Sequence, residues 1–321
     1  MSSKSFFKKV YSIICLTIIF CIKNSGAISA KATIVPLKDD LKLLKELKEY
    51  KVHQELCDKY LDRYVAIKNI EYYDFNGNII DNGVIVVQDT VADSVVRIFE
   101  ELKNKKFPIA PINPRMGRRI TNSFFGKTVE MNEEYADNFT GAYSCRNIEY
   151  TKNLSAHALG TAIDLNFLQN PCIFIDEEKQ EVKSVVPRAG IMYLNRNIER
   201  PNKPYGYGKI DDSVIKIFQK NGFDIWGGNW DSPIDYQHFQ VSSRKFAELL
   251  INMDKNDAKR IFNKHIQCFN KNKRSLNDLA DDEKISLQEI YYNDTGKDKK
   301  NFFEFVDNIC HLTDSRQKLQ R

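Results

Sequence analysis

The chain has 321 residues, 42% of them hydrophobic and 28% charged, which is the composition of a soluble globular protein with one catalytic-sized domain plus extensions. The formal net charge is +5, but residues 1–30 carry four lysines and no acid, so the rest of the chain is nearly neutral at +1. Because that remainder has no stripe of Lys and Arg interleaved with aromatic residues, we exclude a nucleic-acid-binding protein.

Residues 1–30 have the pattern of an export signal peptide. Lysines precede an apolar run at 10–22, and small residues follow it between 25 and 30. The run is shorter than the roughly 20 apolar residues that a membrane-spanning helix needs. We therefore predict an exported protein that is periplasmic, associated with the cell envelope or secreted. The alternative is an uncleaved N-terminal anchor, which would be the chain's only contact with a membrane.

The segment 31–69 is rich in Lys, Glu and Leu with apolar residues at helical spacing, and it predicts one or two amphipathic helices. The stretch 72–88 contains Asn-Gly twice between β-branched and aromatic residues, which predicts a β-hairpin. A helix over 91–103 and a strand over 105–112, ended by proline, are expected next.

The alternation of apolar and polar residues over 161–166 predicts a strand that presents Asp164, with Gly160 as the turn before it. A second hairpin is expected over 172–186, a helix over 211–221 ended by glycine, and a strand over 223–227.

After Arg244 the sequence becomes rich in Lys, Asn and Asp, with helical spacing and no strand pattern. We predict a helical C-terminal extension over 245–321. The mixed order of hairpins and helices favours an α+β fold.

Five cysteines lie beyond the predicted signal, and their odd number and wide spacing give neither a CxxC metal site nor a dense disulfide framework. One or two bridges formed after export, or small buried side chains without bridges, both fit the sequence. The sequence does not say which cysteines would pair. The five are Cys57, Cys145, Cys172, Cys268 and Cys310.

Two of the five histidines each have a carboxylate at short spacing: His157 with Asp164, and His238 with Asp235. Two imidazoles and one carboxylate make a three-ligand catalytic zinc site with a fourth position for water. The alternative is that both histidines are structural and that nearby carboxylates satisfy them. The remaining histidines lie in charged helical stretches and are expected at the surface: His53, His265 and His311.

In the metal interpretation, Asp235 lies three residues before His238, where a general base for the attacking water belongs. Arg146, eleven residues before His157, is the candidate for stabilising the oxyanion or binding a substrate carboxylate. Trp226 and the neighbouring Trp230 are expected to be wall and packing residues, because indole offers one donor and no base.

Two motifs point to a known family. SAHALGTAID at 155–164 fits SxHxxGxAxD, and WGGNWDSPIDYQHF at 226–239 fits a WGG-x-W run followed by DxxHF. Together they resemble the M15 peptidases, the D-alanyl-D-alanine carboxypeptidase and L-alanyl-D-glutamate endopeptidase group that acts on bacterial cell-wall peptides. The resemblance extends over about 70–244, which we take as the peptidase domain.

The resemblance implies a zinc peptidase with a hedgehog/DD-peptidase-like mixed sheet and flanking helices. By position, His157, Asp164 and His238 match the zinc ligands. The general base of the family corresponds to Asp235. The resemblance also assigns roles to two further residues. Arg146 would stabilise the oxyanion or bind a substrate carboxylate, and Ser155 would bind substrate or orient the loop.

We therefore expect an exported Zn²⁺-dependent peptidase that hydrolyses amide bonds in peptidoglycan stem peptides containing D-amino acids. The alternative is a non-catalytic peptide-binding or cell-wall-binding protein that keeps the fold and the metal site. Carboxypeptidase and endopeptidase action both remain open, because the choice depends on whether the cleft is blocked beyond the scissile bond. The sequence leaves the oligomeric state open as well.

Overall fold

The computed structural model describes residues 31–114, 138–148, 150–196, 207–294, 296 and 299–319, and it describes the side chains only up to residue 310. Residues 32–321 form one compact unit. The predicted signal at 1–30 lies outside the described residues. In the described part of the chain, no helix combines the length and the apolar character that crossing a membrane requires.

The first sheet has the antiparallel order β1-β2-β3, formed by Thr33–Pro36, Tyr64–Tyr73 and Ile79–Gln88. β2 and β3 are the predicted hairpin. Its turn is built by Asp74, whose carboxylate accepts backbone hydrogen bonds at 2.8 Å from two residues of the turn, and by Gly77 at φ 81°. The second Asn-Gly pair does not form a turn and lies inside β3.

The predicted N-terminal helices are only partly correct. The helical elements are η1 (Leu37–Asp39), α2 (Leu41–Glu49) and η2 (Glu55–Arg63), whereas β1 and the start of β2 also fall within 31–69. The first four residues of β2 are all buried. A strand that is covered on both faces shows no polar alternation, so the pattern of its apolar run does not distinguish it from the continuation of a helix.

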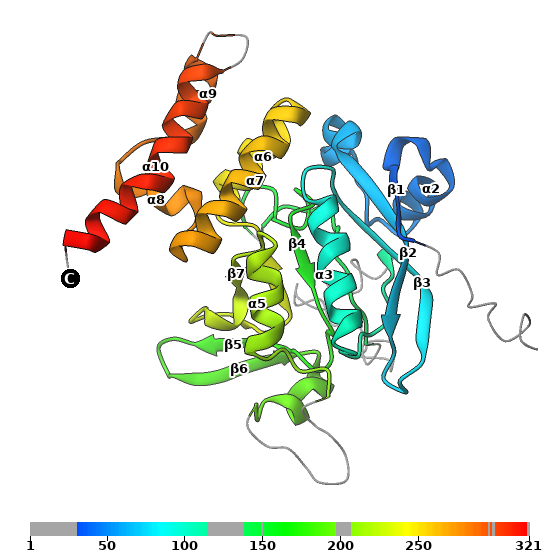
Figure 1. The fold of residues 1–321 in the computed structure, drawn as a ribbon. Coiled ribbons are helices and arrows are strands. Elements are labelled where there is room, and N and C mark those ends of the chain that lie inside the picture. Colours follow the sequence, from blue (N-terminus) through cyan, green and yellow to red (C-terminus); the bar gives the residue numbers. More distant parts are fainter. Residues whose placement is uncertain are drawn as a thin grey trace, which may run out of the picture. The chain divides into compact units, whose positions relative to one another are not determined.

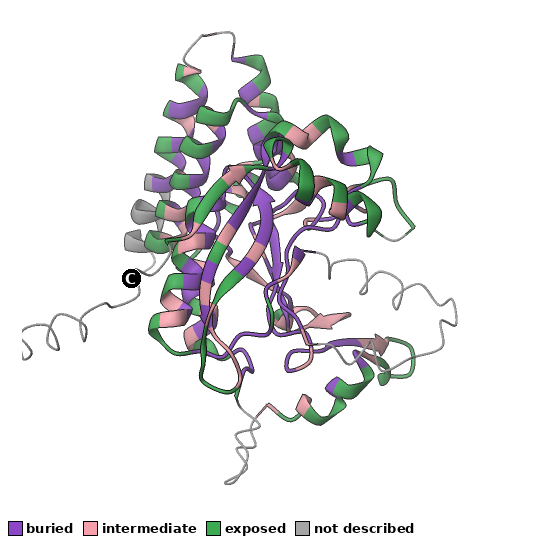
Figure 2. Ribbon diagram, turned by 90° about the vertical axis from the view of Figure 1, so that its right-hand side faces the viewer, coloured by how far each residue is buried: buried purple, intermediate pink, exposed green. Residues whose placement is uncertain are grey.

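The two faces of this sheet pack against different layers (Figures 1 and 2). Val65 and Ile67 join the larger core together with α3 (Ala92–Asn104), which is the predicted helix at 91–103. The other face, with Tyr64 and Ala66, joins a smaller core that includes α2. The sheet is thus the rigid layer against which the site segments pack.

Two further antiparallel sheets carry the middle of the chain. One has the order β4-β9-β7, formed by Ala162–Asp164, His238–Gln240 and Ile225–Trp226. The other has the order β6-β5-β8, formed by Glu181–Val186, Cys172–Asp176 and Ile234–Asp235. The predicted strand at 161–166 and the hairpin at 172–186 are confirmed, and the strand expected at 223–227 is the short β7.

Two sequence predictions about the sheets are wrong. Residues 105–112 form only isolated bridges, Tyr73↔Pro108 and Ile112↔Thr140, because prolines at 108 and 111 remove backbone donors from the ladder. In place of the expected mixed sheet, the described residues form three small antiparallel sheets, and parallel pairing occurs there only as those isolated bridges. The α+β class is correct.

The predicted helix at 211–221 is α5 (Asp212–Lys220), which begins at the capping carboxylate of Asp211 and ends before Gly222 at φ +93°. Two short 3-10 segments, η5 (Arg188–Tyr193) and η6 (Gly227–Asn229), complete the middle of the described chain.

The predicted C-terminal extension is helical. It consists of α6 (Arg244–Asn252), α7 (Lys255–Asn272), α8 (Leu276–Asp282), α9 (Leu287–Asn293) and α10 (Lys300–Leu319). These helices contribute to the same core as α3, α5 and β9, so they pack as part of the same compact unit (Figure 1). A disulfide between Cys268 and Cys310 joins α7 to α10.

Candidate metal centre

The antiparallel pairing of β4 with β9 brings two distant parts of the chain together. Asp164 lies directly opposite His238 in this ladder. Residues directly opposite each other in an antiparallel pair point to the same face. Accordingly, Oδ1 of Asp164 lies 3.2 Å from Nδ1 of His238.

His157 completes the group from the turn that precedes β4. Its Nε2 lies 3.3 Å from Oδ2 of Asp164 and 3.2 Å from Nδ1 of His238. All three side chains are buried, and they offer ligand atoms that lie within 4.8 Å of one another. Among the residues that the structure describes, this is the one such group of His, Cys, Asp and Glu.

The other residues of the first motif shape this turn. Ser155 is buried, and its hydroxyl accepts the backbone N–H of Ala158 at 3.1 Å, so the structure gives it a turn-capping role. Gly160 has φ +69°, and a Cβ there would lie 2.5 Å from the backbone nitrogen of Gln88 in β3. Only glycine therefore allows the turn to pack against the first sheet.

Hydrogen bonds at the outer edges of the two rings fix which nitrogens face the carboxylate. His157 Nδ1 bonds to the carbonyl of Ala142, and His238 Nε2 lies 3.0 Å from Oε1 of Gln240. Because those outer nitrogens donate to acceptors, Nε2 of His157 and Nδ1 of His238 are the nitrogens that face Asp164 and would bind a metal ion. Two ring nitrogens and a carboxylate converge there, which is a donor set that suits a divalent metal ion.

The charges of Asp164 and His238 shift each other's pKa values. Burial acts to raise the pKa of Asp164, but His157 and His238 together outweigh it and hold that pKa well below its usual range. Burial acts to lower the pKa of His238, and the hydrogen bond and charge of Asp164 outweigh it and raise that pKa. The carboxylate therefore stays ionised and available as a ligand.

Asp235 lies in β8, opposite Cys172 of β5. Burial first, and the charge of Asp164 second, raise the pKa of Asp235 to about 7. Its Oδ1 is buried and has no hydrogen-bond partner among the described residues. A carboxyl group with these properties can take up and release a proton near neutral pH.

Arg146 is half-buried, and its charge is among the influences that oppose the raised pKa of Asp235. Its backbone is held on both sides. The Arg146 carbonyl accepts the N–H of Ser155 at 3.1 Å, and the preceding residue, Cys145, forms a disulfide with Cys57. The sequence could not predict this disulfide, which fixes the segment that carries Arg146.

The two tryptophans have the packing roles expected from the sequence. The ring of Trp230 lies against His238 with 5.1 Å between centroids, and the indole N–H of Trp226 donates to the carbonyl of Tyr236 at 2.9 Å. Gly227 lies between them, and a Cβ there would be 2.6 Å from the carbonyl oxygen of Asp235. The residues of the WGG run and Trp230 therefore pack directly against the segment that carries Asp235 and His238.

Two histidines that were expected at the surface are buried. His53 lies between the hydroxyl of Tyr143 at 2.7 Å and Asp58 at 2.8 Å. His265 of α7 lies 3.0 Å from Asp224. A charged helical stretch does not reveal that a distant acid or hydroxyl will satisfy a buried imidazole, which is why the surface prediction failed. The side chain of His311 lies outside the described residues.

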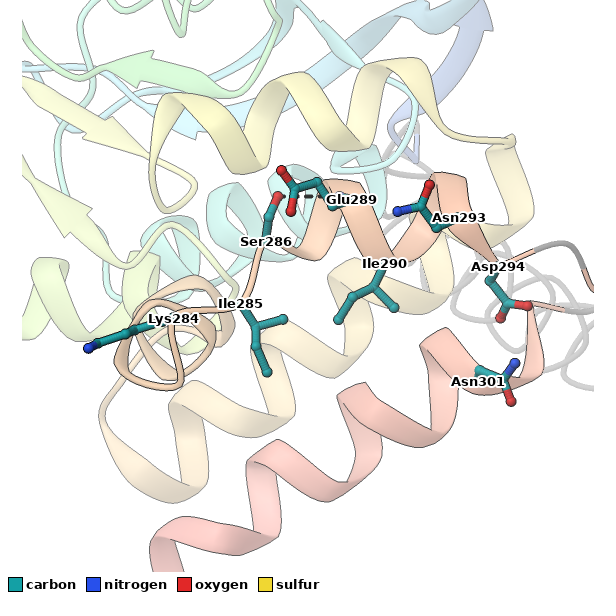
Figure 3. Close-up of a pocket in the computed structure, with 8 residues that line it drawn as sticks. All are labelled: Lys284, Ile285, Ser286, Glu289, Ile290, Asn293, Asp294 and Asn301. Atoms are coloured by element: carbon teal, nitrogen blue, oxygen red, sulfur yellow. Dashed lines mark hydrogen bonds between the residues drawn. The ribbon is translucent and has the colours of Figure 1, made fainter.

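A hollow in the C-terminal extension has none of the candidate metal ligands in its lining (Figure 3). It has a volume of about 470 Å³ and lies beside α9 and the start of α10. Polar side chains, exposed except for Asp294, and two isoleucines line it, with no histidine or cysteine among them. Its lining consists of Lys284, Ile285, Ser286, Glu289, Ile290, Asn293, Asp294 and Asn301.

Residues 149–241 match the family model described as D-alanyl-D-alanine carboxypeptidase. The chain carries an M15-family peptidase segment. The M15 segment contains both motifs and His157, Asp164, Asp235 and His238, and it supports a metallopeptidase. It is narrower than the 70–244 of the sequence resemblance, and Arg146 lies just before it. Neither a curated protein nor a solved structure matches the chain.

Proposed function

We propose that the chain is an exported zinc-dependent peptidase that hydrolyses amide bonds in peptidoglycan stem peptides containing D-amino acids. The observation that carries this proposal is the convergence of His157, Asp164 and His238 within an M15 segment. The description of the matching family supports a bacterial cell-wall peptide as the substrate class.

His157, Asp164 and His238 would hold the ion through two ring nitrogens and a carboxylate, the three-ligand pattern of catalytic zinc sites. When bound, zinc supplies Lewis acidity, which polarises the scissile carbonyl and lowers the pKa of water to roughly 7.

Asp235 would accept the proton of the attacking water and deliver it to the leaving amine. Its burial beside Asp164 supports this role, because a carboxyl group with a pKa near neutrality exchanges protons in both directions. Arg146 would stabilise the oxyanion or bind a substrate carboxylate, since guanidinium makes strong bonds to either. Ser155 would orient the loop that carries His157 rather than bind substrate, because its hydroxyl already caps the turn.

Export and domain organisation belong to the same proposal. We infer a signal at 1–30, a peptidase domain of the hedgehog/DD-peptidase type at 70–244, and N-terminal and C-terminal extensions at 31–69 and 245–321. The two disulfides support export, because disulfides persist in oxidising compartments and are rare in the cytosol. The peptidoglycan substrate also lies outside the cytoplasmic membrane.

The test is to incubate the purified chain with defined muropeptides and zinc and to identify the products by mass. Release of one terminal D-alanine would establish carboxypeptidase action, and a split between L-alanine and D-glutamate would establish endopeptidase action. Asp235→Asn should abolish hydrolysis, whereas Asp231→Asn, an exposed acid in the same loop, should retain it.

Full activity of the Asp235→Asn variant would refute the role of the base. Zinc bound without turnover of any stem peptide would favour the non-catalytic binding protein instead.

A further inference from the structure

A continuous chain of hydrogen bonds connects His238 to the C-terminal extension. His238 Nε2 lies 3.0 Å from Oε1 of Gln240, and Nε2 of Gln240 donates to the carbonyl of Ser242 at 2.8 Å. The N–H of Ser242 donates to Oδ1 of Asp224 at 2.8 Å. The same Oδ1 lies 3.0 Å from Nε2 of His265 in α7.

The link at Ser242 has little freedom. Its φ of +44° lies in the left-handed region, which is unfavourable for a residue with a side chain. Such a conformation persists only where its surroundings hold it. Here the backbone N–H is held by Asp224 and the backbone carbonyl by Gln240, so both ends of the residue are fixed by members of the chain.

The far end of the chain is buried and packed. The side chain of His265 is fully buried between Phe246 and Phe262, whose ring centroids lie 5.1 and 6.1 Å away. The side chain of Asp224 is only 5% exposed. His265 Nε2 faces two acceptors, Asp224 and the carbonyl of Gly222, so this nitrogen carries the ring proton and donates.

The orientation of the Gln240 amide decides what His238 meets. A terminal amide can turn by 180° and exchange its acceptor for its donor. With its NH₂ bound to Ser242, the amide presents oxygen to His238, which accepts the Nε2–H of the ring and leaves Nδ1 as the nitrogen that faces Asp164. A turned amide would place its NH₂ against the ring N–H and would remove the bond that holds the ring.

We propose that Gln240, Asp224 and His265 are positioning residues that hold the ring of His238 with Nδ1 directed at the metal site, so that α7 of the C-terminal extension supports the metal site. The inference rests on the proposed metal-dependent function. It assigns a role to the extension that the sequence did not suggest. Partners of this kind orient the ligand ring and raise its basicity, and their loss typically weakens metal binding about 10- to 100-fold.

The first measurement is zinc affinity of the whole chain, by competition with a chromophoric chelator. Gln240→Leu removes the acceptor and should weaken zinc binding about 10- to 100-fold. Gln240→Glu keeps an acceptor for His238 but loses the donor to Ser242, so it should bind zinc more tightly than Gln240→Leu and more weakly than wild type. His265→Phe keeps the packing and removes the donor. Because it acts at a distance, we expect a loss of about 2- to 30-fold.

The matched control is Tyr291→Phe. The hydroxyl of Tyr291 donates to Asp257 at 2.8 Å, so this variant also removes one hydrogen bond that involves α7, without touching the chain to His238. It should leave zinc affinity unchanged. Thermal unfolding of the metal-free proteins checks that each variant is folded.

The second measurement is the solvent exchange of the Nε2 proton of His238 in the metal-free protein, from the ¹H–¹⁵N spectrum of its ring. Wild type and Tyr291→Phe should show a hydrogen-bonded, slowly exchanging proton, whereas Gln240→Leu and His265→Phe should exchange this proton faster. Unchanged exchange together with wild-type zinc affinity in both variants would overturn the proposal.

If wild type binds no divalent ion, the proposed function fails, and the ring spectra still decide the positioning role. Unchanged exchange of the Nε2 proton in Gln240→Leu would then overturn it.

Discussion

Gly227 is the position where one added methyl group should damage the site most directly. A Cβ there would lie 2.6 Å from the carbonyl oxygen of Asp235 and 3.2 Å from Cβ of His238. The φ of Gly227 does not fall in the left-handed region, so alanine fits its backbone conformation and the effect of Gly227→Ala is one of space alone.

The size of the effect follows from these contacts. Atoms at such positions do not approach closer than 3.0 Å, so the backbone of Asp235 must move by about 0.4 Å. Crowding of this kind typically costs about 1–3 kcal/mol. Because a misplacement of about 1 Å can reduce catalysis about 100-fold, a shift of this size should lower kcat/KM about 10-fold.

The assay compares Gly227→Ala with Gly141→Ala, in thermal unfolding and in hydrolysis of a defined stem peptide. Gly141 exchanges backbone hydrogen bonds with Asp164, yet a Cβ there meets its nearest atom at an ordinary 3.7 Å. The control should retain activity and stability. Wild-type rate and stability in Gly227→Ala would show that the WGG run does not support the second motif.

Three further predictions concern the metal, pH and a disulfide. Removing zinc with a chelator should abolish hydrolysis and lower Tm, and added zinc should restore both; activity that survives in metal-free protein would contradict the proposed chemistry. In the metal-free chain, burial and then the charge of Asp164 raise the pKa of Asp235 to about 7, so the folded state holds a proton that the unfolded state has lost. This contribution to stability is present at low pH and is lost as the pH rises through 7. The free energy of unfolding of Asp235→Asn, measured with urea, should therefore rise relative to that of wild type by roughly 1–3 kcal/mol between pH 5 and pH 8. A difference between the two proteins that stays constant over this range would contradict the raised pKa. Replacing Cys57 and Cys145 by serine opens a bridge with a sequence separation of 88 and should cost about 2–5 kcal/mol of unfolding free energy, whereas Cys172→Ser leaves both bridges intact.

Local sequence patterns were enough to predict an element when its conformation is determined by its own residues. The hairpin turn at Gly77 and the stop after α5 both follow from short-range rules of turn and cap chemistry. The strand that begins at Tyr64 did not follow from them, because burial on both faces removes the alternation by which a strand is recognised. That burial depends on layers supplied by distant segments.

The same distinction holds at the site. The grouping of three candidate metal ligands could be predicted because His157 and Asp164 share one short motif and His238 lies in the other. The pairing of Asp224 with His265 could not, because 41 residues separate them and no local pattern links an acid in a loop to a histidine on a later helix. Cysteine pairing was equally inaccessible, since spacing alone does not say which side chains meet.

The measurement that tests the central claim most directly is anomalous diffraction at the zinc edge from crystals grown with zinc. We expect one strong peak at about 2.0–2.2 Å from Nε2 of His157, a carboxylate oxygen of Asp164 and Nδ1 of His238. No peak between these three side chains at saturating zinc, or a peak held by other residues, would contradict the account.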